Sequence, residues 1–376
     1  MAMVTEPGAM VASSSRRRWL AQVAALGLAA AARPVLAQAD GSEPLRFAAA
    51  WESEAGGYQV GVLQQQKPAG PLARACALSV PTRAHGVWAE PGGTLLAVAR
   101  RPGDWLLRLR MSDGKALAWS WMDGGRAFNG HVIASADGKQ LYTTETDLET
   151  AEGLIGVRDA ASLEKVGEWR THGADPHELL LDADGSLLVA NGGIPTLPET
   201  GRLKVELHRM DASLVRLDTR SGQLLGQWRL ADSRLSLRHI AWGADAQGAR
   251  VLGIALQAEH EDAAARRAAP LLARFDGRQL TAHGAAHTLN GYGGDIAFAG
   301  GRFAVSCPRA DGVALWRADG QWEGFAPLAE ACPLAADRKG ALLWAGGRDA
   351  AARLPLPGDH PAIGGLRVDN HWLMLG

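Results

Sequence analysis

The sequence predicts an all-β fold, a seven-bladed β-propeller formed by a closed ring of four-stranded antiparallel sheets. The first observation is a repeated phrase, in which an apolar run led by a histidine is followed by a tight turn and a second apolar run. The second is its period: His85, His131 and His177 follow one another at intervals of 46 residues, and four short strands with their turns take about 40 to 50 residues. The third is composition, because 46 glycines and 18 prolines without a long helical periodicity indicate many short strands.

The clearest copy of the phrase is DPHELLLDADGSLLVANGG, residues 175–193, with its turn on Asp184-Gly185. The other copies begin at His85, Gly130, Arg238, Gly293 and Ala331. The copies from Gly293 and Ala331 have lost the histidine. The interval from His177 to His239 is 62 residues, because a polar insertion from Gly193 to Met210 follows the second strand of the copy at residues 175–193. We expect this insertion to be a loop.

The first and last parts of the repeat region predict how the ring of blades is closed. Residues 45–51, 58–63 and 74–80 read as three strands of a first blade that lacks an inner strand. Residues 371–375, HWLML, resemble the histidine-led inner strands, so we expect the C-terminus to complete the first sheet. The other blades then begin near His85, His131, His177, His239, Gly294 and Cys332. Seven blades of about 48 residues fit the period, and six or eight remain open.

The N-terminus reads as a signal peptide. Residues 1–39 hold Ser15-Arg16-Arg17-Arg18-Trp19-Leu20, an apolar run over residues 23–32 and Ala37-Gln38-Ala39. Adjacent arginines before an aromatic residue favour the twin-arginine route, with an ordinary signal peptide or an uncleaved anchor as alternatives. The apolar run is short for a membrane span. We therefore expect residues 40–376 to be a single propeller domain in the periplasm, with no transmembrane segment and as a monomer.

Charge and cysteine content exclude several classes of protein. The net charge is −1 for the whole chain and about −4 once residues 1–39 are removed, which gives no support for nucleic-acid binding. The three cysteines are Cys76, Cys307 and Cys332, and no CxxC motif is present. The periplasm permits one disulfide, and Cys307 and Cys332 fall in neighbouring blades, but the odd count leaves at least one thiol.

The histidines are the candidate functional residues. The first strand of each propeller blade lines the central channel, so residues at the same place in successive blades form part of a ring. The candidate metal ligands are therefore His85, His131, His177 and His239, joined by His371 if the C-terminus closes the first blade. Imidazole clusters suit Fe, Cu, Zn or Ni, and we expect Fe or Cu. The residues expected to orient these ligands are Glu178, Asn191 and Asp295, with Glu145 as a further carboxylate.

A structural role is the alternative interpretation of the same histidines. Propeller repeats often place a Gly-His pair at a strand entry, where the imidazole bridges a turn and a strand, and Gly130-His131 fits that description. Four copies in register, in a chain with 11 histidines, are harder to explain in a channel filled only with solvent. Binding of a metal or of an anionic ligand, and a purely structural ring, all stay open at this point.

Several phrases resemble a known family. They include NGHVIASADGKQLYTTE (129–145), THGADPHELLLDADGSLLVANGG (171–193) and GYGGDIAFAGGRFAVSCPR (291–309), and they are similar to the exported bacterial propellers classed as domain of unknown function 1513. The resemblance implies a seven-bladed propeller like the quinoprotein amine dehydrogenase β-chain, often encoded near periplasmic iron-uptake components such as imelysin-like proteins. It supplies no catalytic residues. The chain departs from the family pattern at Cys307, and after Cys332, where proline stands in place of glycine.

Three functions are compatible with these features. The leading hypothesis is a periplasmic metal-binding or accessory protein in bacterial iron acquisition, with periplasmic iron-uptake proteins as partners. The second is a metal-dependent periplasmic oxidoreductase, because histidine-rich channels also hold redox metals. The third is a metal-free protein-interaction scaffold. The catalytic residues and the choice among these functions are not determined by the sequence.

Overall fold

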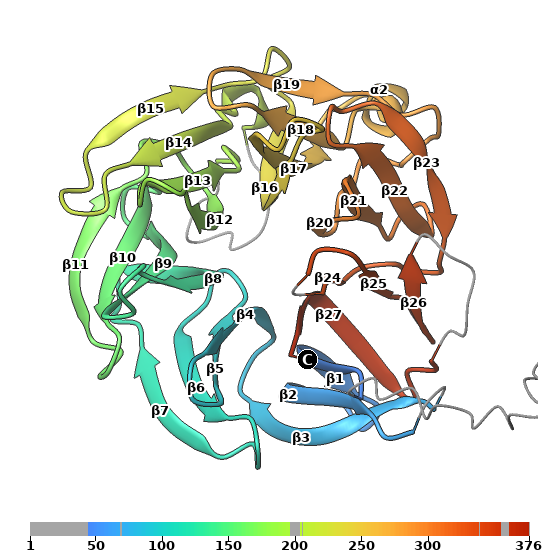
Figure 1. Cartoon of the computed structure of the whole chain (residues 1–376). Coiled ribbons are helices and arrows are strands. Elements are labelled where there is room, and N and C mark those ends of the chain that lie inside the picture. Colours follow the sequence, from blue (N-terminus) through green and yellow to red (C-terminus); the bar gives the residue numbers. More distant parts are fainter. Residues whose placement is uncertain are drawn as a thin grey trace, which may run out of the picture. The chain divides into compact units, whose positions relative to one another are not determined.

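The computed structural model describes residues 44–67, 70–195, 204, 206–337, 339–354 and 361–375. Seven antiparallel sheets are arranged in a ring around a central axis (Figure 1). The predicted seven-bladed propeller is therefore confirmed, and six or eight blades are excluded. The signal peptide expected over residues 1–39 lies outside the described residues. No helix in the described part of the chain combines the length and apolar character needed to span a bilayer.

The C-terminal strand closes the ring as expected. The first blade has the strand order β27-β1-β2-β3, and its strands are β1 (Arg46–Ser53), β2 (Tyr58–Gln65), β3 (Leu72–Val80) and β27 (Leu366–Met374). Strand β27 pairs antiparallel with β1, with Phe47 opposite Met374 and Ala49 opposite Trp372. The indole ring of Trp372 also stacks on the ring of Phe47, and the ring centroids are 4.5 Å apart. The two ends of the propeller are thus joined in one sheet (Figure 1).

The other blades follow in chain order. Blades two and three consist of β4 (Ala84–Glu90), β5 (Thr94–Ala99), β6 (Trp105–Arg110), β7 (Ala116–Trp121), β8 (Arg126–Ala134), β9 (Gln140–Asp147), β10 (Gly153–Asp159) and β11 (Lys165–Arg170). Blades four and five consist of β12 (Pro176–Leu181), β13 (Leu187–Asn191), β14 (Ser213–Leu217), β15 (Leu224–Trp228), β16 (Leu235–Ala244), β17 (Arg250–Ala258), β18 (Leu272–Phe275) and β19 (Leu280–His283). Blades six and seven consist of β20 (Ile296–Ala299), β21 (Arg302–Cys307), β22 (Gly312–Arg317), β23 (Trp322–Pro327), β24 (Leu334–Ala336), β25 (Leu343–Gly346) and β26 (Ala351–Leu354).

Blade seven has three strands among the described residues, whereas the other six sheets have four. The insertion after β13 is in part outside the described residues, and its described part contains one 3-10 turn, η2 (Leu207–Arg209). The short helix α2 (Ala263–Ala268) begins after Asp262, whose side chain accepts a hydrogen bond from the Ala265 amide and so satisfies one free donor of the first turn.

The core lies between the blades, where apolar faces of neighbouring sheets pack together. One cluster joins Val60 and Ala50 of blade one to Leu95, Leu107 and Trp105 of blade two. The middle strands are buried almost throughout, while the outermost strands β7, β11 and β15 contain only exposed and half-buried residues. Successive inner strands contact each other around the ring. This packing holds the inner strands rigidly around the channel, which is where the histidines lie.

Candidate metal centre

Five inner strands carry the histidines into the channel through the same local irregularity. Strands β4, β8, β12, β16 and β27 each pair regularly with the second strand of their blade except at one place, where the register shifts. In every case the histidine lies inside the shift: His85, His131, His177, His239 and His371. A bulge frees a residue from the pleated alternation and changes the direction of its side chain. The repeat therefore encodes a repeated bulge as well as a repeated histidine.

The Nε2 atoms of three of these rings lie within contact distance of one another. The distance between Nε2 atoms is 2.8 Å for His177 and His239, and 3.4 Å both for His85 and His177 and for His85 and His239. One ring nitrogen from each of the four residues His85, His131, His177 and His239 falls within 4.8 Å of the others. The Nε2 atom of His371 lies 3.0 Å from that of His239. These five residues are called the histidine cluster below.

These separations match the requirements of one metal ion. Imidazole nitrogens bind such ions at about 2.0–2.1 Å, and two ligands at that distance, separated by 90° to 109°, are about 2.8 to 3.4 Å apart. The three distances among His85, His177 and His239 cover the same range. The Nδ1 atoms of these three rings are buried and have no hydrogen-bond partner among the described residues. Their polar contacts therefore converge on Nε2.

Burial keeps four of the histidines in the form that binds metals. The pKa values of His85, His131, His177 and His239 all lie well below the usual value, chiefly because burial disfavours the charged ring. Neighbouring histidines lower these pKa values further. Neutral imidazoles keep a free lone pair, so the cluster is ready to donate to a cation at neutral pH.

Two carboxylates lie beside the Nδ1 atoms of the other two histidines, His131 and His371. The Glu178 Oε1 atom lies 3.7 Å from His131 Nδ1, and the Nε2 atom of that ring is buried without a partner among the described residues. The Asp295 Oδ1 atom lies 3.2 Å from His371 Nδ1. Burial opposes ionisation of His371, but Asp295, together with Glu178 and Asp369, outweighs burial and raises the pKa of this histidine. A carboxylate on Nδ1 that leaves Nε2 for the metal is the usual arrangement around metal-binding histidines.

The same carboxylates connect neighbouring blades. Glu178 lies on β12 of blade four and accepts a hydrogen bond of 2.7 Å from the Ile240 amide of blade five. Burial raises the pKa of the Glu178 carboxyl to about 7. Asp295 accepts hydrogen bonds from the amides of Ile296 and Leu334, in blades six and seven. Both residues therefore fix the positions of inner strands that surround the cluster.

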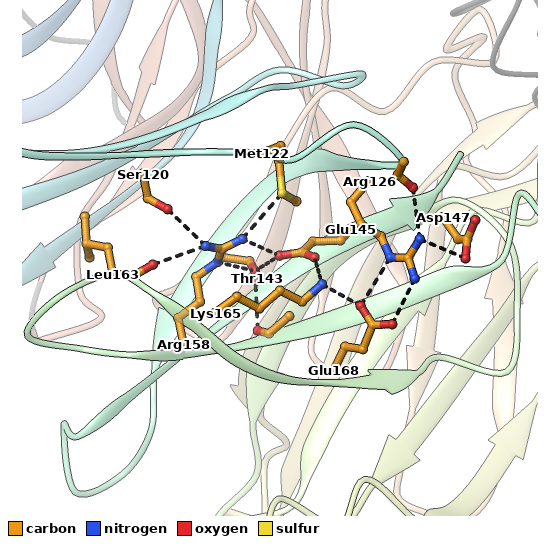
Figure 2. Close-up of polar contacts among 12 residues, drawn as sticks. Ser120, Met122, Arg126, Thr143, Glu145, Asp147, Arg158, Leu163, Lys165 and Glu168 are labelled. Atoms are coloured by element: carbon orange, nitrogen blue, oxygen red, sulfur yellow. Dashed lines mark hydrogen bonds and ion pairs between the residues drawn. The ribbon is translucent and has the colours of Figure 1, made fainter. Parts of the chain in front are cut away.

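The structure places Asn191 and Glu145 away from these contacts. The Asn191 amide donates to the Thr171 carbonyl oxygen at 2.9 Å, beside Ser213 of its own blade. Glu145 is fully buried inside blade three, where it accepts hydrogen bonds from Arg158 at 2.8 Å and from Lys165 at 2.8 Å (Figure 2). The side chain that neutralises a buried carboxylate could not be read from the sequence. Glu145 belongs to an ion-pair network within its blade.

Sequence reasoning missed the arginines next to the cluster. A small cavity of about 30 Å³ has the following lining residues: His85, His177, His239, Arg100, Arg101, Arg238, Gln257, Tyr292 and Asn370. Such a volume holds one or two water-sized groups. Arg238 directly precedes His239 within the same bulge, and its charge adds to burial and to His239 in lowering the pKa of His177. The sequence signal was therefore present, as an arginine beside a repeat histidine.

The cysteines take no part in the cluster. All three are free thiols in the structure. Burial raises the pKa values of Cys307 and Cys332 to about 12, so both are protonated at neutral pH. The disulfide between Cys307 and Cys332 that the sequence left open is not formed here.

Comparison with known proteins gives a family and a fold. A family model described as "Protein of unknown function (DUF1513)" matches residues 78–375. No curated protein matches the sequence. The crystal structure of a functionally unknown protein from Desulfotomaculum acetoxidans DSM 771 superimposes with a TM-score of 0.56 and 8% sequence identity, over 88% of this chain and 99% of the other. At that identity the likeness concerns the fold alone.

Proposed function

The chain belongs to the DUF1513 family of proteins of unknown function, and we propose that this member binds one transition-metal ion in the histidine cluster. The observation that carries the proposal is the triangle of Nε2 atoms of His85, His177 and His239, with sides of 2.8, 3.4 and 3.4 Å. Neutral, buried imidazoles in this arrangement bring several lone pairs to one point. A cation at that point binds them all, whereas a lone imidazole pair forms one hydrogen bond at most.

His131 completes the ligand set in this proposal. It belongs to the group of four histidines whose nitrogens lie within 4.8 Å, and Glu178 stands next to its Nδ1. His371 contacts the cluster through His239 and is held by Asp295. A set of ligands made only of imidazoles suits iron, copper, zinc or nickel, and we propose iron or copper before the other two.

We place the function in bacterial iron acquisition, as a periplasmic metal-binding or accessory protein. Support comes from the signal-like residues 1–39 and from the resemblance to exported propellers encoded near iron-uptake components. In this role the protein would hold the metal and exchange it with a periplasmic partner. A deletion strain complemented with wild type or with His177→Ala tests this role. We expect only the wild type to restore iron accumulation under iron limitation, and equal restoration by both would contradict it.

The metal site itself is tested by titration of the mature protein after chelator treatment. Fe(II), Cu(II) and Zn(II) are added anaerobically in separate experiments, and binding is followed by calorimetry and by competition with a chromophoric chelator. We expect saturation at one equivalent for at least one metal. Absence of tight binding for all three, in a protein that remains folded, would make the cluster structural and favour the metal-free interaction scaffold.

A metal-dependent oxidoreductase is the second candidate, and the cavity beside the cluster favours it. Redox or hydrolytic metal sites need an open coordination position with space for a substrate. Three of the cluster histidines also line the cavity of about 30 Å³, so a small molecule there would lie next to the metal. Consumption of O₂ or peroxide that depends on the bound metal and is absent from His177→Ala would favour the enzyme.

A further inference from the structure

The cavity beside the histidine cluster is lined by three arginines. Its lining includes Arg100, Arg101 and Arg238 and, among the described residues, no carboxylate. The Asp175 carboxylate stands behind two of these arginines and forms ion pairs with both Arg101 and Arg238. Buried guanidinium groups in the wall of a cavity favour an anionic ligand.

Two of the three guanidinium nitrogens of Arg238 have no hydrogen-bond partner among the described residues. The side chain is 1% exposed, and its Nη1 atom donates to Asp175 Oδ2 at 2.7 Å. Its Nε and Nη2 atoms are buried and have no hydrogen-bond partner in the part of the chain that the structure describes. Buried donors are nearly always satisfied, and those of a charged group are the most expensive to leave unmatched. The unmatched edge therefore indicates a ligand.

The chemistry of that edge points to a carboxylate. The Nε and Nη2 atoms of arginine donate two parallel hydrogen bonds, which match the two oxygens of a carboxylate. This protein uses the same edge elsewhere. Arg108 holds Glu90 through Nε and Nη2 with distances of 2.7 and 2.7 Å, and Arg229 holds Asp211 with distances of 2.6 and 2.9 Å. Arg238 lines the cavity, and among the described residues no carboxylate pairs with this edge.

We propose that the cavity binds the carboxylate group of a small organic acid on the Nε and Nη2 atoms of Arg238, beside the histidine cluster. The volume of about 30 Å³ admits a carboxylate group but no bulky acid as a whole. Gln257 and Asn370, also in the lining, supply further polar groups. This site stands on the arginine and the cavity alone and does not require the metal.

A second part of the inference rests on the proposed metal function. His85, His177 and His239 line the same cavity, so a carboxylate on Arg238 lies next to the metal and one of its oxygens becomes a further ligand. Binding of metal and binding of carboxylate then strengthen each other by the same factor.

Acetate is the probe, because it binds free metal ions weakly. Its affinity for the chelator-treated mature protein is measured by calorimetry, against chloride at equal ionic strength and against sulfate as a tetrahedral anion. We expect wild type to bind acetate. The variant Arg238→Lys keeps a positive charge beside Asp175 but loses the two parallel N–H donors, so we expect it to bind acetate at least tenfold more weakly. Arg229→Lys makes the same change in an exposed pair and should leave acetate binding unchanged.

The outcomes separate the two proposals. Acetate binding without any metal binding would leave the anion site standing and remove the metal site. Metal binding with no acetate binding, in both metal-free and metal-loaded wild type, would overturn the anion site alone. Should Arg238→Lys fail to fold, a crystal structure of wild type soaked with acetate decides the matter. A carboxylate on the Nε and Nη2 atoms of Arg238 is expected, and acetate only at other places would contradict the proposal.

Discussion

His177 and His239 come from neighbouring blades, and their Nε2 atoms lie 2.8 Å apart in the channel. Both rings are buried, and both have pKa values well below the usual one because burial disfavours their charged forms. Two neutral imidazoles at this distance share at most one proton between them. The contact gives the pair a hydrogen bond in the metal-free protein and two ligand positions on a bound cation.

Removal of either ring of this pair should abolish tight metal binding. We expect His177→Ala to lower the affinity for the bound metal by at least about 100-fold, equivalent to about 2.7 kcal/mol, because one of few ligands is lost. Chelator competition at pH 7.5 measures it. His208→Ala is the matched control, because His208 is exposed on η2. Equal losses in both variants would show that the cluster does not bind the metal.

The metal-free protein should lose stability as the pH falls below about 6.5. In the unfolded chain each histidine takes up a proton near pH 6.5, whereas His85, His131, His177 and His239 remain neutral when folded because their pKa values are lowered. The unfolded state therefore binds more protons, and acid favours it, by up to about 1.4 kcal/mol per pH unit for each such histidine.

Two groups of the cluster act in the opposite direction. The raised pKa values of His371 and Glu178 let the folded state hold protons that the unfolded state releases, so their contributions are lost as the pH rises. Below pH 6.5 the extra protons that the unfolded state takes up on four histidines outnumber those that the folded state retains on these two groups. Urea unfolding between pH 5 and 7.5 measures the balance, and the slope should be smaller in His85→Gln. A flat profile in wild type would show that the folded cluster takes up protons as readily as the unfolded chain.

Glu178 should matter more for metal binding above pH 7 than below it. Its pKa of about 7 means that the carboxylate becomes charged in this range, and the charge acts on His131 Nδ1 at 3.7 Å. Glu178→Gln keeps an oxygen for the Ile240 amide but not the charge. We expect metal affinity about 10-fold below wild type at pH 8 and close to wild type at pH 6. Glu206→Gln, an exposed site, is the control, and a deficit independent of pH would argue against a charge effect.

Glu145 should be needed for stability and not for metal binding. It is the buried centre of the network in Figure 2, between Arg158 and Lys165. Glu145→Ala leaves Arg158 buried without its partner, so we expect a loss of about 3–5 kcal/mol in the free energy of unfolding with unchanged metal stoichiometry. Glu168→Gln removes a half-exposed member of the same network and should cost less than about 1 kcal/mol. Loss of metal from a stable Glu145→Ala variant would place this residue in the site.

Closure of the ring should depend on Trp372. Its side chain is buried and stacks on Phe47 across the pairing of β27 with β1. Trp372→Ala opens a cavity at the seam, so we expect a loss of about 3–5 kcal/mol in unfolding free energy. Trp121→Ala serves as a control, because Trp121 is exposed on an outer strand. Comparable unfolding midpoints for the two variants would show that the seam contributes little.

The fold could be predicted from the sequence because every blade of a propeller repeats the same local pattern of strands and turns. The regular spacing from His85 to His177 set the blade length, and the similarity of residues 371–375 to the other inner strands identified the closing strand. Apolar runs and turn residues determine strands and turns locally, so the strands lie where the sequence pattern predicts them. The blade starts near His131 and His239 accordingly fall within β8 and β16.

The surroundings of the histidines were less accessible to sequence reasoning. Glu145 and Glu178 both stand on inner or second strands near a repeat histidine, yet one pairs with Arg158 and the other lies beside His131. That difference depends on which side chains arrive from other strands. The arginine edge of Arg238 was missed for the same reason, because only the packed structure shows that two of its nitrogens lack partners.

Elemental analysis of the purified protein, residues 40–376, tests the central claim most directly, with wild type compared with a His177→Ala/His239→Ala double variant. The account predicts about one equivalent of iron or copper per wild-type chain and almost none in a double variant that circular dichroism shows to be folded. Metal-free wild type, even after anaerobic reconstitution, or a double variant that retains the full equivalent, would contradict a metal centre in the histidine cluster.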